Sequence, residues 1–76
     1  MPKYKDLDGD SNVVAYEYGG DWIEVEFASG TARFYLYTYN SAGALHVEAM
    51  KRLADLGDGL NAYINVNVRK DYASKR

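Results

Sequence analysis

Aromatic side chains gather in one short stretch, and their spacing could support stacking or interface chemistry. Residues 33–39 read Arg-Phe-Tyr-Leu-Tyr-Thr-Tyr. Aromatic and β-branched residues favour strands, and alternate side chains of a strand point to opposite faces. Arg33, Tyr35, Tyr37 and Tyr39 would then lie on one face. Exposed rings of this kind can stack on single-stranded bases, and they are also enriched at protein interfaces.

Trp22 extends this aromatic row in the predicted sheet, but acids lie beside it. Glu24 and Glu26 alternate with apolar residues and would share the face, where they repel phosphate. Three interpretations therefore stay open. The face could be a platform for single-stranded RNA or a patch that binds a protein. It could also be a second small core, covered by Tyr63, Tyr72 or the basic C-terminal residues.

Charge is unevenly distributed along the chain. The formal net charge is −2, yet residues 6–58 contain ten acids and only three bases. An acidic body disfavours general affinity for nucleic acid. Basic residues in the last part of the sequence could still contact a nucleic-acid backbone locally, although such runs are more often solubilising tails. The candidate backbone-contacting residues are Arg69, Lys70, Lys75 and Arg76.

An acidic segment near the beginning of the chain matches part of a calcium-loop pattern. Asp6, Asp8, Asp10 and Glu17 stand at positions 1, 3, 5 and 12 of that pattern. However, Ser11 occupies the position where the sharp turn of the loop needs glycine. The segment before Asp6 is also too short for the entering helix. We therefore expect no calcium site, and the sequence predicts neither a metal nor a cofactor.

Residue types that could support catalysis are few. His46 is the only histidine and falls on the apolar side of a predicted helix, where a packed ring with one hydrogen bond is expected. Glu24 and Glu26 would lie about 7 Å apart on a strand, but exposed strand acids usually serve solubility. The Gly-Asp-Gly of residues 57–59 lacks the lysine and the preceding strand of a phosphate loop. The sequence therefore predicts a protein that is not an enzyme.

Glycine-containing turns separate three alternating segments, which predicts an antiparallel meander. Turns at Gly19-Gly20 and Ser29-Gly30 join strands over residues 13–18, 22–27 and 32–39. A type I′ turn at the paired glycines would place Tyr16 opposite Ile23.

The second turn sets the register of the third strand. It places Val25 opposite Phe34 and Trp22 opposite Tyr37. A slip by one residue would move Arg33 and the tyrosines into the core, which the hydrophobic pattern is expected to forbid. The core face is expected to hold Val14, Tyr16, Tyr18, Ile23, Val25, Phe27, Phe34 and Leu36. The opposite face is expected to hold Glu17, Trp22, Glu24, Glu26, Arg33, Tyr35, Tyr37 and Tyr39.

A main helix should follow the meander and cover its core face. Asn40 or Ser41 can cap it, and Gly57 can stop it after Leu56. A three-stranded sheet needs such a cover for stability. The apolar side of the helix would comprise Leu45, Val47, Ala49, Met50, Leu53, Ala54 and Leu56, and the opposite side Glu48, Lys51, Arg52 and Asp55.

The last segment fits two structures equally well. Alternation over residues 62–68 is typical of a strand. The spacing of Leu60, Ile64, Val68 and Tyr72 is typical of a helix. Pattern alone leaves both possibilities open.

Length and composition describe one small domain. The 76 residues include no cysteine, so neither a disulfide framework nor a thiolate metal site can supplement the core. No apolar run approaches the roughly 20 residues of a membrane-spanning helix, and no apolar signal segment begins the chain. We therefore expect a cytoplasmic protein without a membrane partner.

Several short motifs occur in an order that resembles the KTSC domain, a family of small bacterial and phage domains named for a lysyl-tRNA synthetase C-terminal-like segment. An opening Ser-x-Val leads to a tyrosine, an alternating strand ends in Phe-x-x-Gly, and a central Tyr-x-Tyr precedes a helix, a Gly-x-Asn and a final tyrosine. The matching residues are Ser11, Val13, Tyr18, Ile23, Val25, Phe27, Gly30, Tyr35, Tyr37, Gly59, Asn61, Ile64 and Tyr72.

The resemblance implies an α+β fold in which a three-stranded antiparallel meander is covered on one face by a main helix. It favours a short C-terminal helical segment over a strand. The match covers residues 11–72, which we take as the domain. The polar residues 1–10 are expected to form a flexible arm, and residues 73–76 a basic tail. The function of the family is not established, and RNA binding is only a suggestion for it.

Together these observations predict a small non-enzymatic interaction module that acts through an aromatic sheet face. Its partner would be a protein or, alternatively, single-stranded RNA, and no small-molecule substrate is evident. The candidate binding face comprises Trp22, Arg33, Tyr35, Tyr37 and Tyr39.

Overall fold

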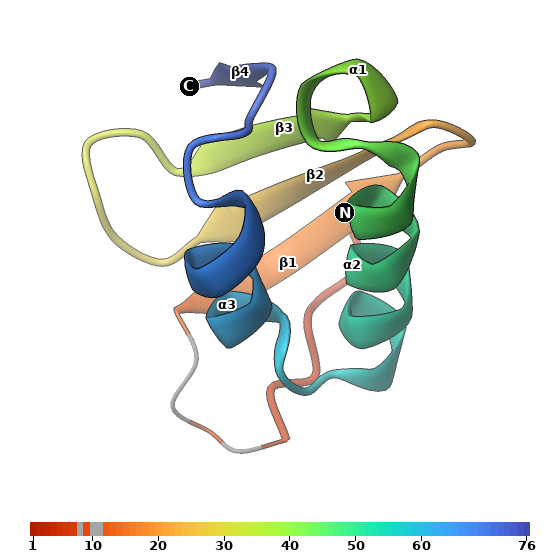
Figure 1. Ribbon diagram of the computed structural model, residues 1–76. Coiled ribbons are helices and arrows are strands. Elements are labelled where there is room, and N and C mark those ends of the chain that lie inside the picture. The colour runs from red at the N-terminus through yellow and green to blue at the C-terminus, as the bar shows by residue number, and fades with distance from the viewer. Residues whose placement is uncertain (8, 10–11) are drawn as a thin grey trace.

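The computed structural model describes residues 1–7, 9 and 12–76 and has an α+β fold. Four antiparallel strands form one sheet in the order β1-β2-β3-β4 (Figure 1). This confirms the predicted meander and adds a two-residue strand at its edge. The strands are β1 (Val13–Tyr18), β2 (Trp22–Phe27), β3 (Phe34–Thr38) and β4 (Ser74–Lys75).

Helices cover one face of the sheet, as expected (Figure 1). The main helix lies beside a shorter C-terminal helical segment, whose second half is a π-helix. A helix is therefore the correct interpretation of the ambiguous last segment. The elements are α1 (Tyr39–Ala42), α2 (Ala44–Leu56), α3 (Leu60–Tyr63) and η1 (Ile64–Val68).

The register between β2 and β3 differs from the prediction by one residue. Val25 pairs with Tyr35 instead of Phe34, and Trp22 pairs with Thr38 instead of Tyr37. A shift of one residue exchanges the two faces of a strand. The tyrosines of β3 therefore point toward the helices, and Phe34 and Leu36 point away from them.

The loop between β2 and β3 explains the shift. The amide of Phe27 donates to the carbonyl of Arg33, so the loop is longer than the expected Ser29-Gly30 turn. Both faces of β3 are apolar or aromatic, and hydrophobicity alone could not assign them. Tyr37 is only 1% exposed, so the expectation that its ring lies on an open face is wrong.

The turn between β1 and β2 also differs from the prediction. Tyr18 pairs with Ile23, whereas Tyr16 was expected there. The pairing moves by two residues, so the faces of β1 near the turn stay as predicted. Gly19 is required here by a close approach, because a Cβ atom on it would lie 2.2 Å from Nε1 of Trp22.

The helical part after β3 begins earlier than expected and is interrupted. The hydroxyl of Thr38 accepts from the amide of Ser41, and the Ser41 hydroxyl accepts from the amide of Thr38. This capping box starts α1 at Tyr39, so the predicted caps Asn40 and Ser41 are wrong. Gly43 separates α1 from α2, and α2 ends at Gly57 as predicted.

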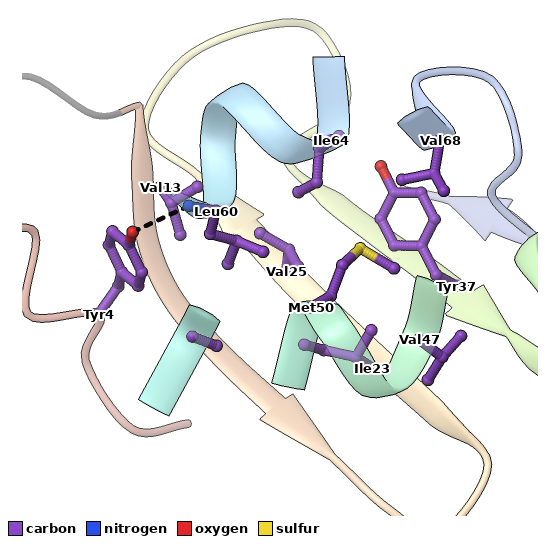
Figure 2. Close-up of a cluster of buried hydrophobic side chains, with 11 residues drawn as sticks. Tyr4, Val13, Ile23, Val25, Tyr37, Val47, Met50, Leu60, Ile64 and Val68 are labelled. Atoms are coloured by element: carbon purple, nitrogen blue, oxygen red, sulfur yellow. Dashed lines mark hydrogen bonds between the residues drawn. The ribbon is translucent and has the colours of Figure 1, made fainter. Parts of the chain in front are cut away.

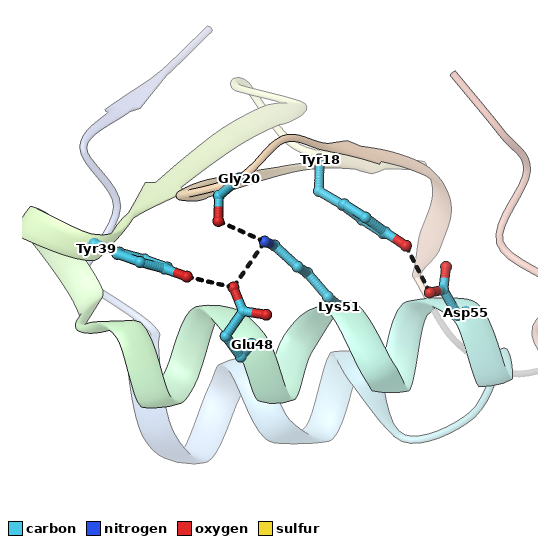
Figure 3. A network of polar contacts seen from close by, with 6 residues as sticks. All are labelled: Tyr18, Gly20, Tyr39, Glu48, Lys51 and Asp55. Atoms are coloured by element: carbon cyan, nitrogen blue, oxygen red, sulfur yellow. Dashed lines mark hydrogen bonds and ion pairs between the residues drawn. The ribbon is translucent and has the colours of Figure 1, made fainter.

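The two sides of α2 are partly exchanged relative to the prediction. Leu45 and Leu56 are 79% and 58% exposed, although both were assigned to the apolar side. Lys51 was assigned to the polar side but lies against the sheet. Its ammonium donates to the Gly20 carbonyl over 2.9 Å and contacts Glu48 over 2.7 Å (Figure 3). The hydrogen bond that Glu48 accepts from Lys51 lowers the pKa of the Glu48 carboxyl.

The core lies between the sheet and the helices (Figure 2). Burial of apolar surface is the main stabilising contribution in such a layer. From the C-terminal helical segment, Leu60, Ile64 and Val68, which are spaced by four positions, all point into the core. The fully buried large side chains are Ile23, Val25, Tyr37, Val47, Met50, Leu60 and Val68.

The two ends of the sequence contribute to this domain. Tyr4 is buried, and its hydroxyl accepts from the amide of Leu60 (Figure 2). The amide of Leu7 donates to the carbonyl of Gly57. Ser74 and Lys75, from the predicted basic tail, pair with β3. Within the described part of the chain, no helix is long and apolar enough to cross a membrane.

Candidate binding groove

A groove of about 330 Å³ opens between the β2–β3 loop, β3 and the C-terminal helical segment. Its volume is near the lower end of the roughly 300–1,000 Å³ that ligand pockets occupy. It contains two of the tyrosines and two of the basic residues that the sequence analysis selected. We call it the C-terminal groove and define it by Tyr35, Tyr37, Asn61, Asn65, Arg69, Lys70 and Tyr72.

One wall of the C-terminal groove is aromatic. The Phe27 and Tyr35 ring centroids are 5.3 Å apart, and those of Tyr35 and Tyr72 are 5.2 Å apart. Both pairs meet edge to face, an arrangement that aromatic rings favour. Tyr72 thus packs against the β3 tyrosines, as one of the three interpretations expected. Tyr35 and Tyr72 nevertheless stay partly exposed and can contact a ligand.

Tyr37 supplies a polar group at the buried side of the C-terminal groove. Its ring packs among core residues, and its hydroxyl points toward the C-terminal helical segment (Figure 2). The hydroxyl forms no hydrogen bond with any described residue, and Tyr37 lines the C-terminal groove. Burial raises the pKa of Tyr37 well above its usual value, so the hydroxyl stays protonated. It can therefore donate to a ligand or accept from one.

The opposite wall is a polar stripe on the C-terminal helical segment. Leu60, Ile64 and Val68 are buried, and the residue after each of them lines the C-terminal groove. An α-helix drifts by about 40° over four residues, and the wider turns of η1 counteract that drift. The stripe therefore stays aligned with the opening. Its members are Asn61, Asn65 and Arg69.

The side chains of this stripe are available for binding. Asn61 and Asn65 form no side-chain hydrogen bond with the described residues, and each amide offers both donors and an acceptor. Arg69 and Lys70 are exposed, and neither forms an ion pair with a described residue. The C-terminal groove thus combines rings, free amides and cations.

The remaining predicted site residues lie elsewhere. Trp22 is on the sheet face opposite the helices. The Tyr39 hydroxyl donates to the Glu48 carboxylate over 2.6 Å (Figure 3). Lys75 stacks on Tyr72, with 5.2 Å from its nitrogen to the ring centroid. The expected single face is therefore wrong.

Arg33 and Arg76 lie close together beside Phe34 and also line a shared depression outside the C-terminal groove.

Sequence reasoning missed Asn61 and Asn65. Their spacing was visible, because Asn61, Asn65 and Arg69 repeat every four residues beside the apolar series. Asparagine is unfavourable in both helices and strands, yet residues 61–67 contain three. Asn67 donates to the Tyr63 carbonyl, which leaves Asn61 and Asn65 as candidates for binding. The sequence alone could not show that Asn61, Asn65 and Arg69 lie across the groove from Tyr37.

His46 has a structural contact, as predicted. Its Nδ1 lies 2.6 Å from the Tyr63 hydroxyl, which joins α2 to α3. Among residues 1–7, 9 and 12–76, no three His, Cys, Asp or Glu side chains gather as metal ligands do. Asp8, Asp10 and Ser11 of the calcium-loop pattern lie outside the described residues, so the expectation about calcium stays a prediction.

Comparisons with protein-family models, curated proteins and solved structures find no match. The resemblance to the KTSC domain therefore stays a prediction.

Proposed function

We propose that this protein is a small non-enzymatic binding module that holds single-stranded RNA in the C-terminal groove. The observation that carries the proposal is the position of Tyr37. Tyr37 is almost fully buried, its hydroxyl has no hydrogen-bond partner among the described residues, and it lines a groove with partly exposed rings, amides and cations. Sequence-tolerant binding of single strands combines stacking on aromatic rings with cations that follow the backbone.

Each group of the C-terminal groove matches a part of a nucleotide. Tyr35 offers ring surface to a base, beside Tyr72, whose ring Lys75 covers on one side. Stacking contributes roughly 1–3 kcal/mol per base. The amides of Asn61 and Asn65 can bond to a base edge, which single strands leave accessible. Arg69 and Lys70 can contact phosphate at the rim.

The charge distribution supports this placement. The body of the chain is acidic, but five basic residues surround the C-terminal groove and the neighbouring edge of the sheet: Arg33, Arg69, Lys70, Lys75 and Arg76. These basic residues can therefore attract a phosphate backbone to the C-terminal groove, while the acidic remainder of the surface repels it.

Binding of an oligouridine of about eight nucleotides tests the proposal, since single-strand sites span roughly 4–16 nucleotides. Affinity should fall steeply as salt rises. The double substitution Arg69→Glu and Lys70→Glu should weaken binding strongly and reduce the salt slope by about 1.4. Arg52→Glu is the matched control, because Arg52 is exposed on α2 and does not line the C-terminal groove. Equal affinity for the double variant and the control would contradict the proposal.

A further inference from the structure

The sheet face opposite the helices is open and carries a second set of interacting groups. We call it the outer face. Cross-strand pairs place acids beside apolar and aromatic residues along its length. All the central side chains are partly exposed, and the helices lie on the other side of the sheet (Figure 1). Its central residues are Trp22, Glu24, Glu26, Phe34, Leu36 and Thr38.

One end of the outer face already holds a cation of this chain. The Arg76 guanidinium lies 4.5 Å from the centroid of the Phe34 ring. Its Nη2 atom is 3.4 Å from a carboxylate oxygen of Glu24. The π-face of an aromatic ring attracts a cation that lies over it, and a nearby carboxylate attracts the same cation by its charge. The outer face is therefore suited to guanidinium groups.

At the other end, Asp21 and Trp22 hold no cation of the described residues, and Glu24, which pairs with Arg76, lies between the two ends. Asp21, Trp22, Glu24, Leu36 and Thr38 line a shallow depression of about 360 Å³. Indole is the aromatic ring that binds cations best. The Asp21 carboxylate forms no ion pair or hydrogen bond with the residues that the structure describes.

The Trp22 indole packs against the turn between β1 and β2, where a Cβ atom on Gly19 would lie 2.2 Å from its Nε1. The ring stays partly exposed. The depression therefore presents it to a cation beside Asp21 and Glu24.

We propose that the outer face binds a basic segment of a partner protein, with a lysine or arginine side chain on Trp22 between Asp21 and Glu24. Side chains that alternate along a strand are about 7 Å apart. Trp22, Glu24 and Glu26 alternate along β2, so they match cations at alternate positions of an extended peptide. The carboxylates attract such a segment and repel phosphate, which separates this site from the C-terminal groove.

The peptide acetyl-Arg-Gly-Arg-Gly-Arg-amide is a direct probe, and the same peptide with citrulline is a neutral control of similar shape. Trp22 is the only tryptophan, so its fluorescence reports on this site alone. The arginine peptide should produce a saturable change, and the citrulline peptide should not. Asp21→Asn and Glu24→Gln should each weaken binding about fivefold.

Two further variants separate this site from the C-terminal groove. Asp71→Asn removes an exposed acid outside the outer face and should leave peptide binding unchanged. Arg69→Glu should not weaken it either. The inference is overturned if the arginine peptide leaves Trp22 fluorescence unchanged in the folded protein. It is also overturned if the citrulline peptide binds equally well, or if both Asp21→Asn and Glu24→Gln bind like the unmodified chain.

Discussion

Two groups of tyrosines on the same face of one sheet differ in what their hydroxyls contact. Near the β1–β2 turn, Tyr16 and Tyr18 donate to the Asp55 carboxylate over 2.9 and 2.7 Å (Figure 3 shows the Tyr18 contact). In the C-terminal groove, the hydroxyls of Tyr35 and Tyr37 form no hydrogen bond with the described residues. The same residue type is structural where α2 supplies an acceptor, and available to a ligand where no acceptor is supplied.

The charged side chains of the two regions also differ in whether they have partners. In the turn region, the nearly buried Lys51 ammonium contacts Glu48 and the Gly20 carbonyl, and the Asp55 carboxylate accepts from Tyr16 and Tyr18. The C-terminal groove has exposed cations without ion-pair partners among the described residues. Satisfied groups stabilise the fold, whereas unsatisfied groups at an opening are available for binding. Substitutions should therefore separate stability from affinity.

The largest expected effect distinguishes the ring of Tyr37 from its hydroxyl. Tyr37→Ala should lower the free energy of unfolding by about 3–5 kcal/mol, because it empties a core position. Tyr37→Phe keeps the ring and removes no intramolecular hydrogen bond, so stability should change by less than about 0.5 kcal/mol. Its affinity for oligouridine should nevertheless fall about fivefold. Urea unfolding and a binding titration on the same samples measure both effects.

The next effect belongs to the turn region. The Lys51 side chain is 11% exposed and donates to Gly20 and Glu48. Lys51→Met should lower the free energy of unfolding by about 1–3 kcal/mol, because charged hydrogen bonds to partly buried partners are lost. Oligouridine affinity should not change. If Lys51→Met weakened RNA binding as strongly as Arg69→Glu, the separation between the two regions would be wrong.

The smallest expected effect concerns how stability changes at alkaline pH, and it involves Tyr16. Burial, and then the hydrogen bond to Asp55, raise the pKa of Tyr16 to about 12. A raised pKa favours the protonated form in the folded state, so this contribution is complete below pH 10 and disappears as pH rises toward 12. Tyr16→Phe should reduce the loss of stability across that range. Thermal unfolding followed at several pH values would show it, and an identical pH dependence in both proteins would exclude this contribution.

The fold could be predicted from the sequence because its signals agree with one another. Alternation in Trp22–Phe27 and the stop at Gly57 each specify one structure locally. The assignment of β3 failed because Phe34, Tyr35, Leu36 and Tyr37 make both faces suitable for burial, so the loop length decided the register.

The C-terminal groove was less predictable, since it joins segments distant in sequence. Tyr37 and Arg69 were both selected from the sequence, Tyr37 for an open sheet face and Arg69 as a separate contact to a nucleic-acid backbone. Only the C-terminal helical segment, folded against β3, brings them to one opening. Asn61 and Asn65 become candidate binding residues only in the fold, because burial of Leu60 and Ile64 turns their side chains toward the groove.

The central claim is that the C-terminal groove, and not the outer face, binds RNA. Amide and side-chain NMR shifts measured during titration with oligouridine test this most directly. We expect saturable shifts that centre on Tyr35, Tyr37, Asn65 and Arg69, with little change at the Trp22 indole. Shifts that centre on Trp22, or a spectrum unchanged by oligouridine at low salt, would contradict the account.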